Sequence, residues 1–132
     1  MGVHIITNKA IELNGITIVG LGSLWANDND MHILDKYQER DHVLVLTHNP
    51  DTTLAYLPQH SPDLTLAGHT HGGQIRIPYR YKQVIPVEGD VLWDQGIYDL
   101  ENNKVFVSSG IGEVGLPMRL FIPPAIDILT LY

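Results

Sequence analysis

The sequence contains no cysteine and few basic residues, and each shortage excludes a class of site. Without cysteine there are no disulfides and no thiolate metal ligands. Eight lysines and arginines against fifteen aspartates and glutamates give a formal net charge of −7 at pH 7. A protein that binds nucleic acid as its main partner needs a basic surface. We therefore expect no nucleic acid as the main partner.

Long hydrophobic runs are also missing. No apolar run approaches the roughly 20 residues that a membrane-spanning helix needs, and the N-terminus lacks a signal-peptide pattern. A hydrophobic content of 44% with 17% charged residues is ordinary for a soluble globular protein. The 132 residues predict a single domain, or part of one. We expect a soluble chain whose parent protein is cytoplasmic or peripheral to a membrane.

Short apolar runs separated by turn residues predict an α/β fold. Asn14-Gly15 between two apolar runs predicts a β-hairpin, and the continuous run Val43–Leu46 predicts a strand buried on both faces. Strands are predicted at residues 11–13, 16–19, 43–46, 64–67, 75–77, 96–100, 104–107 and 125–131, and helices at 31–40 and 50–57, the second capped by Asn49. This order predicts a layered α/β sandwich that continues into a mostly antiparallel sheet. The chain is short of elements to cover such apolar strands.

Three of the seven histidines follow predicted buried strands. His48 comes directly after one apolar run, and His69 and His71 come after the next, among glycines that leave room for a ligand. Imidazole is the commonest protein ligand for transition metals, so these three predict a metal site. The others are interpreted as structural or surface residues: His4, His32, His42 and His60.

The residues around these histidines resemble a known family. The string Gly68-His-Thr-His-Gly-Gly-Gln-Ile75, with Thr47-His-Asn-Pro50 upstream, resembles the C-terminal motif pair of the calcineurin-like metallophosphoesterases, in the bacterial YkuE/YaeI-type branch. The tail from Val107 to Pro124 is also similar to that branch, and the resemblance covers nearly the whole chain. It implies the C-terminal half of a layered α/β/β/α sandwich with a mixed sheet.

The resemblance also implies a chemistry. The complete family site holds two divalent metal ions, manganese, iron or zinc, and a bridging hydroxide attacks the phosphorus of a phosphate monoester or diester. It implies that His48 and His69 bind one metal and His71 the other. No protein nucleophile is required, so no residue is assigned a direct catalytic role.

The sequence departs from the family pattern in its carboxylates. The family's other ligands come from Asp-x-His, Gly-Asp-x-x-Asp and Gly-Asn-His motifs, and we find none of them here in a matching context. The aspartates at 28, 30, 41 and 51 stand in other surroundings. Without the bridging carboxylate, two cations a few ångströms apart repel each other. We therefore expect the chain alone to be weak or inactive as an enzyme.

Two arginines after the double-histidine loop are candidates for binding the phosphate. Arg76 and Arg80, with Lys82, form the only local basic cluster. The competing interpretation of this cluster is a solvated strand edge, and it is the stronger one.

Two functions of different classes remain open. One is the C-terminal half of a metallophosphoesterase, and the other is a non-catalytic metal-binding or interaction fragment. The two functions can be distinguished by asking whether a second polypeptide supplies the missing aspartate and asparagine metal ligands.

Incomplete covering of the sheet predicts self-association. An exposed apolar face and unpaired strand edges favour a homo-oligomer, or association with a missing N-terminal half. We expect light scattering on the purified chain to give a mass above that of one chain. A monodisperse monomer would contradict this expectation.

Overall fold

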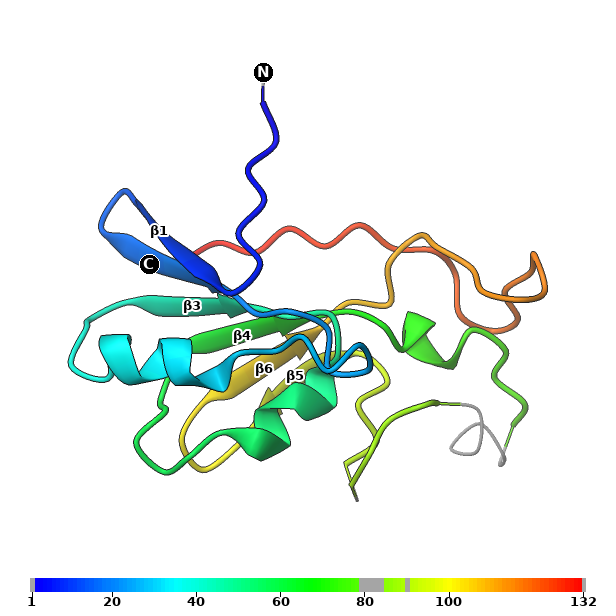
Figure 1. Cartoon of the computed structure of the whole chain (residues 1–132). Helices are drawn as coiled ribbons and strands as arrows, with labels where there is room; N and C mark the ends of the chain where they lie inside the picture. Colours follow the sequence, from blue (N-terminus) through cyan, green and yellow to red (C-terminus); the bar gives the residue numbers. More distant parts are fainter. Residues whose placement is uncertain (1, 79–84, 90, 132) are drawn as a thin grey trace.

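One six-stranded mixed sheet organises the chain (Figure 1). The computed structural model describes residues 2–78, 85–89 and 91–131. The strands run in the spatial order β1-β2-β3-β4-β6-β5. Their bounds are β1 (Lys9–Leu13), β2 (Ile16–Gly20), β3 (Val43–Leu46), β4 (Leu64–Ala67), β5 (Gly96–Asp99) and β6 (Lys104–Val107). The four inner strands are parallel, and the outer strands β1 and β5 are antiparallel to their neighbours. The mixed α/β sheet expected from the sequence is confirmed.

The β1–β2 hairpin turns at Asn14-Gly15, as predicted. Leu13 pairs with Ile16 across a two-residue loop. Both loop residues have positive φ, 52° at Asn14 and 84° at Gly15. Asparagine and glycine tolerate this conformation, and such a turn matches the natural twist of the two strands. The local sequence therefore favours this turn and the register that it imposes on the two strands.

The helices are shorter and tighter than predicted. They are 3₁₀ segments: η1 (Met31–Tyr37), η2 (Pro50–Ala55) and η3 (His71–Gly73). The Asp30 side chain caps η1 by accepting from the His32 amide at 3.1 Å. Tyr56, which follows η2, is already extended, with φ −65° and ψ 133°. Segments of one or two turns gain few helical hydrogen bonds, so 3₁₀ geometry is common in them.

The sheet buries one face well. Val19, Val43 and Val45 pack with Ile33 and Leu34 of η1 into the main core cluster. A second cluster gathers Trp93, Val105 and Val107 on the β5–β6 side of the sheet.

The other face of the central strands is only half covered. Residues of β3 and β4 alternate between buried and half-buried, and Leu44, Leu46, Leu64 and Leu66 are half-buried. The expectation of strands buried on both faces is therefore wrong for the described chain. The shortage of covering elements noted in the sequence is real.

Two predicted strands are absent, and β6 pairs with β4 in parallel where an antiparallel pairing was expected. Ile75 makes a single isolated bridge with Leu120 instead of a 75–77 strand, and residues 125–131 form no ladder in the described structure. The expected antiparallel second half is confirmed for β5 with β6 and wrong for β6 with β4, which pair in parallel. The long connection between β4 and β6 permits this, since parallel neighbours require a crossover. No helix among the described residues is long and apolar enough to cross a membrane.

The central strand β3 should be sensitive to loss of volume. We expect Val45→Ala, at 0% exposure, to lower the free energy of unfolding by about 2–3 kcal/mol, because it removes buried carbon and leaves a cavity. Val3→Ala, at 94% exposure, is the matched control and should change stability by less than about 0.5 kcal/mol. Urea denaturation followed by tryptophan fluorescence measures both. Equal effects would contradict the assigned core.

Candidate metal centre

Two parallel strands end together at one edge of the sheet. β3 and β4 are neighbours in register, with Leu46 opposite Leu66. The hydrogen-bond pattern continues past both strands, since the Thr47 amide donates to Leu66 O at 3.0 Å and the Gly68 amide donates to His48 O at 3.1 Å. His48 and His69 therefore emerge side by side.

The rings of His48 and His69 face each other through nitrogen atoms. The distance between His48 Nε2 and His69 Nδ1 is 3.1 Å, and the ring centroids are 4.8 Å apart. Two ring nitrogens that each lie about 2.1 Å from one metal ion, at a right angle, are about 3.0 Å apart. The spacing of this pair fits two neighbouring ligands of a single ion.

The second nitrogen of His69 determines its tautomer. Nε2 lies 3.0 Å from Pro86 O, and a carbonyl only accepts, so Nε2 carries the proton and Nδ1 carries the lone pair in the neutral ring. Without a metal ion, His48 Nε2 therefore donates to His69 Nδ1. A backbone carbonyl on the far nitrogen is the usual way in which proteins orient a metal-binding histidine. Trp25 packs its ring edge-on against His69, with 4.5 Å between centroids.

His71 is held by Gln74, a buried side chain with four hydrogen bonds. The Gln74 amide nitrogen donates to Val114 O at 2.9 Å and to Leu116 O at 3.0 Å, and its Oε1 accepts from the Val114 amide at 2.8 Å. Flipping the amide would set oxygen against two carbonyls, so its orientation is determined. Oε1 lies 3.1 Å from His71 Nδ1, which must therefore donate. The lone pair of neutral His71 is on Nε2.

Electrostatics favour a neutral ring at His48. Partial burial of its ring lowers the pKa of His48, and the neighbouring His69 and His71 lower it further by charge repulsion. A neutral ring is the form that binds metal.

The backbone of the double-histidine loop is unusual. His69, His71 and Gln74 have φ values of 66°, 51° and 42°. This left-handed region of backbone conformation is energetically unfavourable for any residue that has a side chain. Gly72, with φ 62°, lies against Ile122 and Ser109, where an added Cβ would be 2.8 Å from Ile122 Cγ1. Arg119 donates to His71 O at 3.1 Å and to Ser109 O at 2.7 Å. Conformations of this kind cluster at functional sites and persist only where surrounding contacts hold them.

The described residues bring two histidine rings together and form no complete coordination shell. Among residues 2–78, 85–89 and 91–131, no three histidine, aspartate or glutamate side chains lie close enough to hold one ion. His71 belongs to the same loop, but it does not complete a three-ligand group. The residues therefore fit part of a metal site.

Asp30 and His32 have the spacing of an Asp-x-His motif but lie in another setting. Asp30 Oδ1 caps η1, and His32 Nδ1 lies 3.2 Å from Asp35 Oδ2 on the exposed surface. The interpretation of His32 as a surface residue is confirmed.

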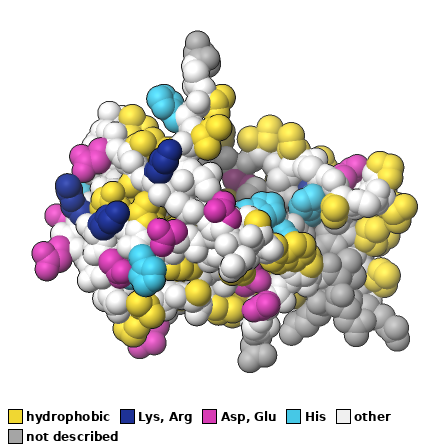
Figure 2. Space-filling view, viewed as in Figure 1, with side chains coloured by type: hydrophobic (Ala, Val, Ile, Leu, Met, Phe, Trp, Pro, Cys, Tyr) yellow, Lys and Arg dark blue, Asp and Glu magenta, His cyan; other side chains and the backbone are white. Residues whose placement is uncertain are grey.

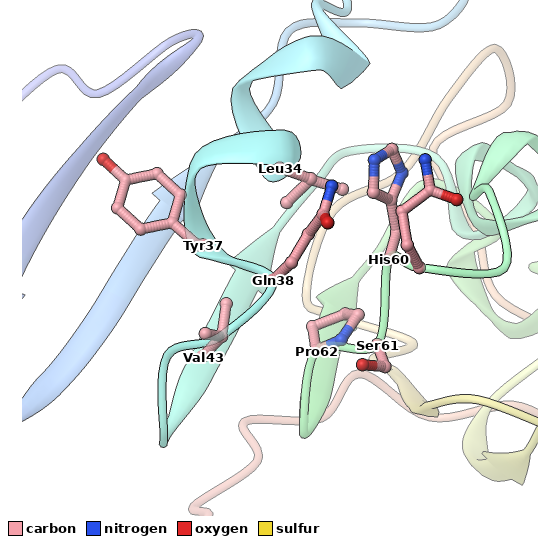
Figure 3. A pocket seen from close by; sticks show the side chains of 8 residues that line it. Leu34, Tyr37, Gln38, Val43, His60, Ser61 and Pro62 are labelled. Atoms are coloured by element: carbon pink, nitrogen blue, oxygen red, sulfur yellow. The ribbon is translucent and has the colours of Figure 1, made fainter.

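His60 is a structural histidine. Its Nδ1 accepts from the Leu57 amide at 3.3 Å, and its Nε2 lies 2.8 Å from Asp35 Oδ1, which lowers the pKa of Asp35. The pocket beside it, shown in Figure 3 with Leu34, Tyr37 and His60 among its lining residues, measures about 10 Å³. That is roughly the space of one water molecule, too little for a substrate.

The two candidate arginines differ in what the structure shows. Arg76 lies in no strand; its Nε donates to Gly72 O at 2.8 Å and its Nη2 pairs with Asp94 at 2.8 Å. Tyr98 also donates to Asp94, at 2.6 Å, and the pKa of Tyr98 is raised to about 12, by burial first and then by this carboxylate. Phosphate binding by Arg76 stays a prediction. Arg80 lies outside the described residues.

Gln74, Pro86 and Arg119 were not assigned to the site from the sequence. Gln74 and Pro86 form hydrogen bonds with the ring nitrogens of His71 and His69. Arg119 donates to the backbone carbonyls of His71 and Ser109. Gln74 belongs to the eight-residue string that carries the resemblance, which is the only local signal for its role. Nothing local points to Pro86, because its contact depends on the fold.

The fold and the paired histidines fit the metallophosphoesterase class that the sequence motifs suggested, and known proteins of that class are similar to the chain. An uncharacterized metallophosphoesterase of Campylobacter jejuni is 38% identical over 96% of the chain. YkuE of Bacillus subtilis, also an uncharacterized metallophosphoesterase, is 32% identical over 88%, and the phosphodiesterase YaeI of Escherichia coli is 30% identical over 98%. The chain belongs to the metallophosphoesterase family.

Within that family, the chain falls in the branch that contains YkuE and YaeI. It matches the C-terminal portions of these relatives and spans 34% of the Campylobacter protein, 40% of YkuE and 48% of YaeI. No family model and no solved structure matches the chain.

The tautomer of His71 is directly measurable. We expect long-range ¹H–¹⁵N spectra of the metal-free chain to show His71 with its proton on Nδ1, because Gln74 Oε1 can only accept. Gln74→Met, of similar length, removes the acceptor and should leave His71 as a mixture of tautomers. His60 is the internal reference, with its proton on Nε2 in both proteins. A protonated Nε2 in wild-type His71 would contradict the assigned network.

Proposed function

We propose that this chain supplies the histidine ligands of a metal site that hydrolyses phosphate esters. The observation that carries the proposal is the 3.1 Å contact between His48 Nε2 and His69 Nδ1 at the ends of two parallel strands. Membership of the metallophosphoesterases and the name of YaeI support the reaction class. The substrate of this chain's site is then a phosphate ester.

The residues of the chain have distinct tasks in this function. His48 and His69 would hold one ion through their facing nitrogens once His48 Nε2 has lost its proton, and His71 would offer Nε2 to a second ion. Pro86 O and Gln74 hold the two loop histidines in the tautomers required. When bound, the divalent ions, manganese, iron or zinc, polarise the phosphoryl group and supply a nucleophilic hydroxide. Histidine ligands alone do not select among these metals.

The remaining ligands come from outside the described residues in this proposal. The relatives are two to three times as long as the segment that matches this chain. In this proposal the carboxylate ligands come from a further part of a longer protein or from a second polypeptide. The half-covered sheet face and the exposed apolar residues Ile126 and Ile128, at 83% and 90%, support such a partner. A second copy of the chain is the competing partner.

The alternative function is a non-catalytic metal-binding or interaction fragment. It is favoured by one observation, the lack of any three-ligand group among the described residues. It differs from the first proposal in predicting no hydrolysis with any partner.

Metal stoichiometry tests the proposed ligands. After loading with Mn²⁺ and dialysis, mass spectrometry should count one ion per chain and not two, because the chain brings only one pair of ring nitrogens together. His69→Ala should lose that ion. His4→Ala, which removes an exposed histidine far along the sequence from the site, is the matched control and should retain it.

Two outcomes would contradict these assignments. Equal metal content in the His69→Ala and His4→Ala chains would exclude His69 as a ligand. Two ions per chain, with metal-dependent hydrolysis of bis(p-nitrophenyl) phosphate, would show that the chain carries a complete site and needs no partner.

A further inference from the structure

A cavity opens directly beside the two loop histidines. It measures about 190 Å³ and is lined by His69, His71, Ile75, Pro86, Val114 and Leu116 among others. In Figure 2, histidine side chains near the middle of the visible face adjoin hydrophobic ones. The lining of the cavity places His69 and His71, two of the proposed metal ligands, beside apolar side chains.

The wall of this cavity is built by specific hydrogen bonds. Gln74, 7% exposed, bonds both backbone atoms of Val114 and the carbonyl of Leu116. Arg119 holds the preceding turn through Gly112 O, at 2.7 Å from Nη2. The loop that carries the two apolar side chains is thus tied at two points to the histidine loop. Such anchoring distinguishes a preformed pocket from a chance hollow.

The chemistry of the lining selects the occupant. No lysine, arginine, aspartate or glutamate is among the described residues that line the cavity. Hydroxyl groups of a sugar or glycerol would leave water for a surface with few partners, which costs free energy. Val114 and Leu116 are 72% and 61% exposed, so an apolar occupant would remove exposed carbon from water.

We propose that this cavity binds the hydrocarbon group of the phosphate ester, as an aryl or short alkyl substituent. The proposal rests on the proposed function, which places the phosphate at His69 and His71. The volume suits a ring, since a cavity of about 150 Å³ accepts benzene. The site then prefers esters whose organic group is apolar next to the phosphate.

Binding to the zinc-loaded 132-residue chain tests the preference. Phenylphosphonate and methylphosphonate share a head group and differ in the hydrocarbon. We expect phenylphosphonate to bind at least about tenfold more tightly, and to shift the methyl NMR signals of Val114 and Leu116. Leu116→Asn should reduce this ratio towards one, whereas Ile111→Asn, an exposed change outside the lining residues, should leave it unchanged. Equal affinities in the wild-type chain would overturn the proposal.

A second measurement needs no metal and separates the two proposals. Benzyl alcohol, added to the metal-free chain, should shift the Val114 and Leu116 methyl signals in the wild-type and Ile111→Asn chains. In Leu116→Asn the remaining Val114 methyl signals should not shift. If these shifts occur while the chain binds no metal, the cavity stands and the proposed function fails. If the chain binds metal and benzyl alcohol leaves the signals unmoved, the cavity proposal fails alone.

Discussion

The parallel pairing of β3 with β4 is the constraint on which the site depends. In a parallel pair the carboxyl ends of both strands lie at the same edge, so residues that follow the strands meet there. The register places the carbonyl of His48 against the amide of Gly68, one residue before His69. A shift of one residue would turn either side chain to the opposite face and separate the two rings.

The loops around the histidines form a second layer of constraint. Pro86 bonds His69, Gln74 bonds His71, and Arg119 bonds the carbonyl of His71. The contacts of Pro86 and Arg119 span long stretches of sequence, whereas Gln74 lies three residues from His71 and joins that ring to the backbone of Val114 and Leu116. Together they offset the cost of the positive φ angles in the histidine loop, since strained backbone persists only where surrounding contacts hold it.

The incomplete sheet connects the fold with the proposed function. One face is packed by η1 and its neighbours, whereas the other leaves the central leucines half covered. The same chain brings two histidine rings together, and its described residues provide no third side chain that could complete a metal site with them. Both features have one explanation in the proposal of a further part that covers the sheet and brings carboxylates to its edge.

Strand positions could be predicted from the sequence where the signal was local. The Asn14-Gly15 hairpin and the runs at β3, β4 and β6 were located correctly, because apolar runs and turn residues act over a few positions. The run at 125–131 has an equally strong apolar pattern but forms no ladder. A strand needs a neighbour, and its own residues do not provide one.

The candidate site divides in the same way. The sequence by itself determined which residue types are available, three histidines after apolar runs and no cysteine, and these limited the chemistry. Only the tertiary structure decided that His48 and His69 face each other, that Gln74 sets the tautomer of His71, and that Arg76 pairs with Asp94. These contacts join segments far apart in the chain or depend on the backbone angles of a loop. Local patterns carry no information about either.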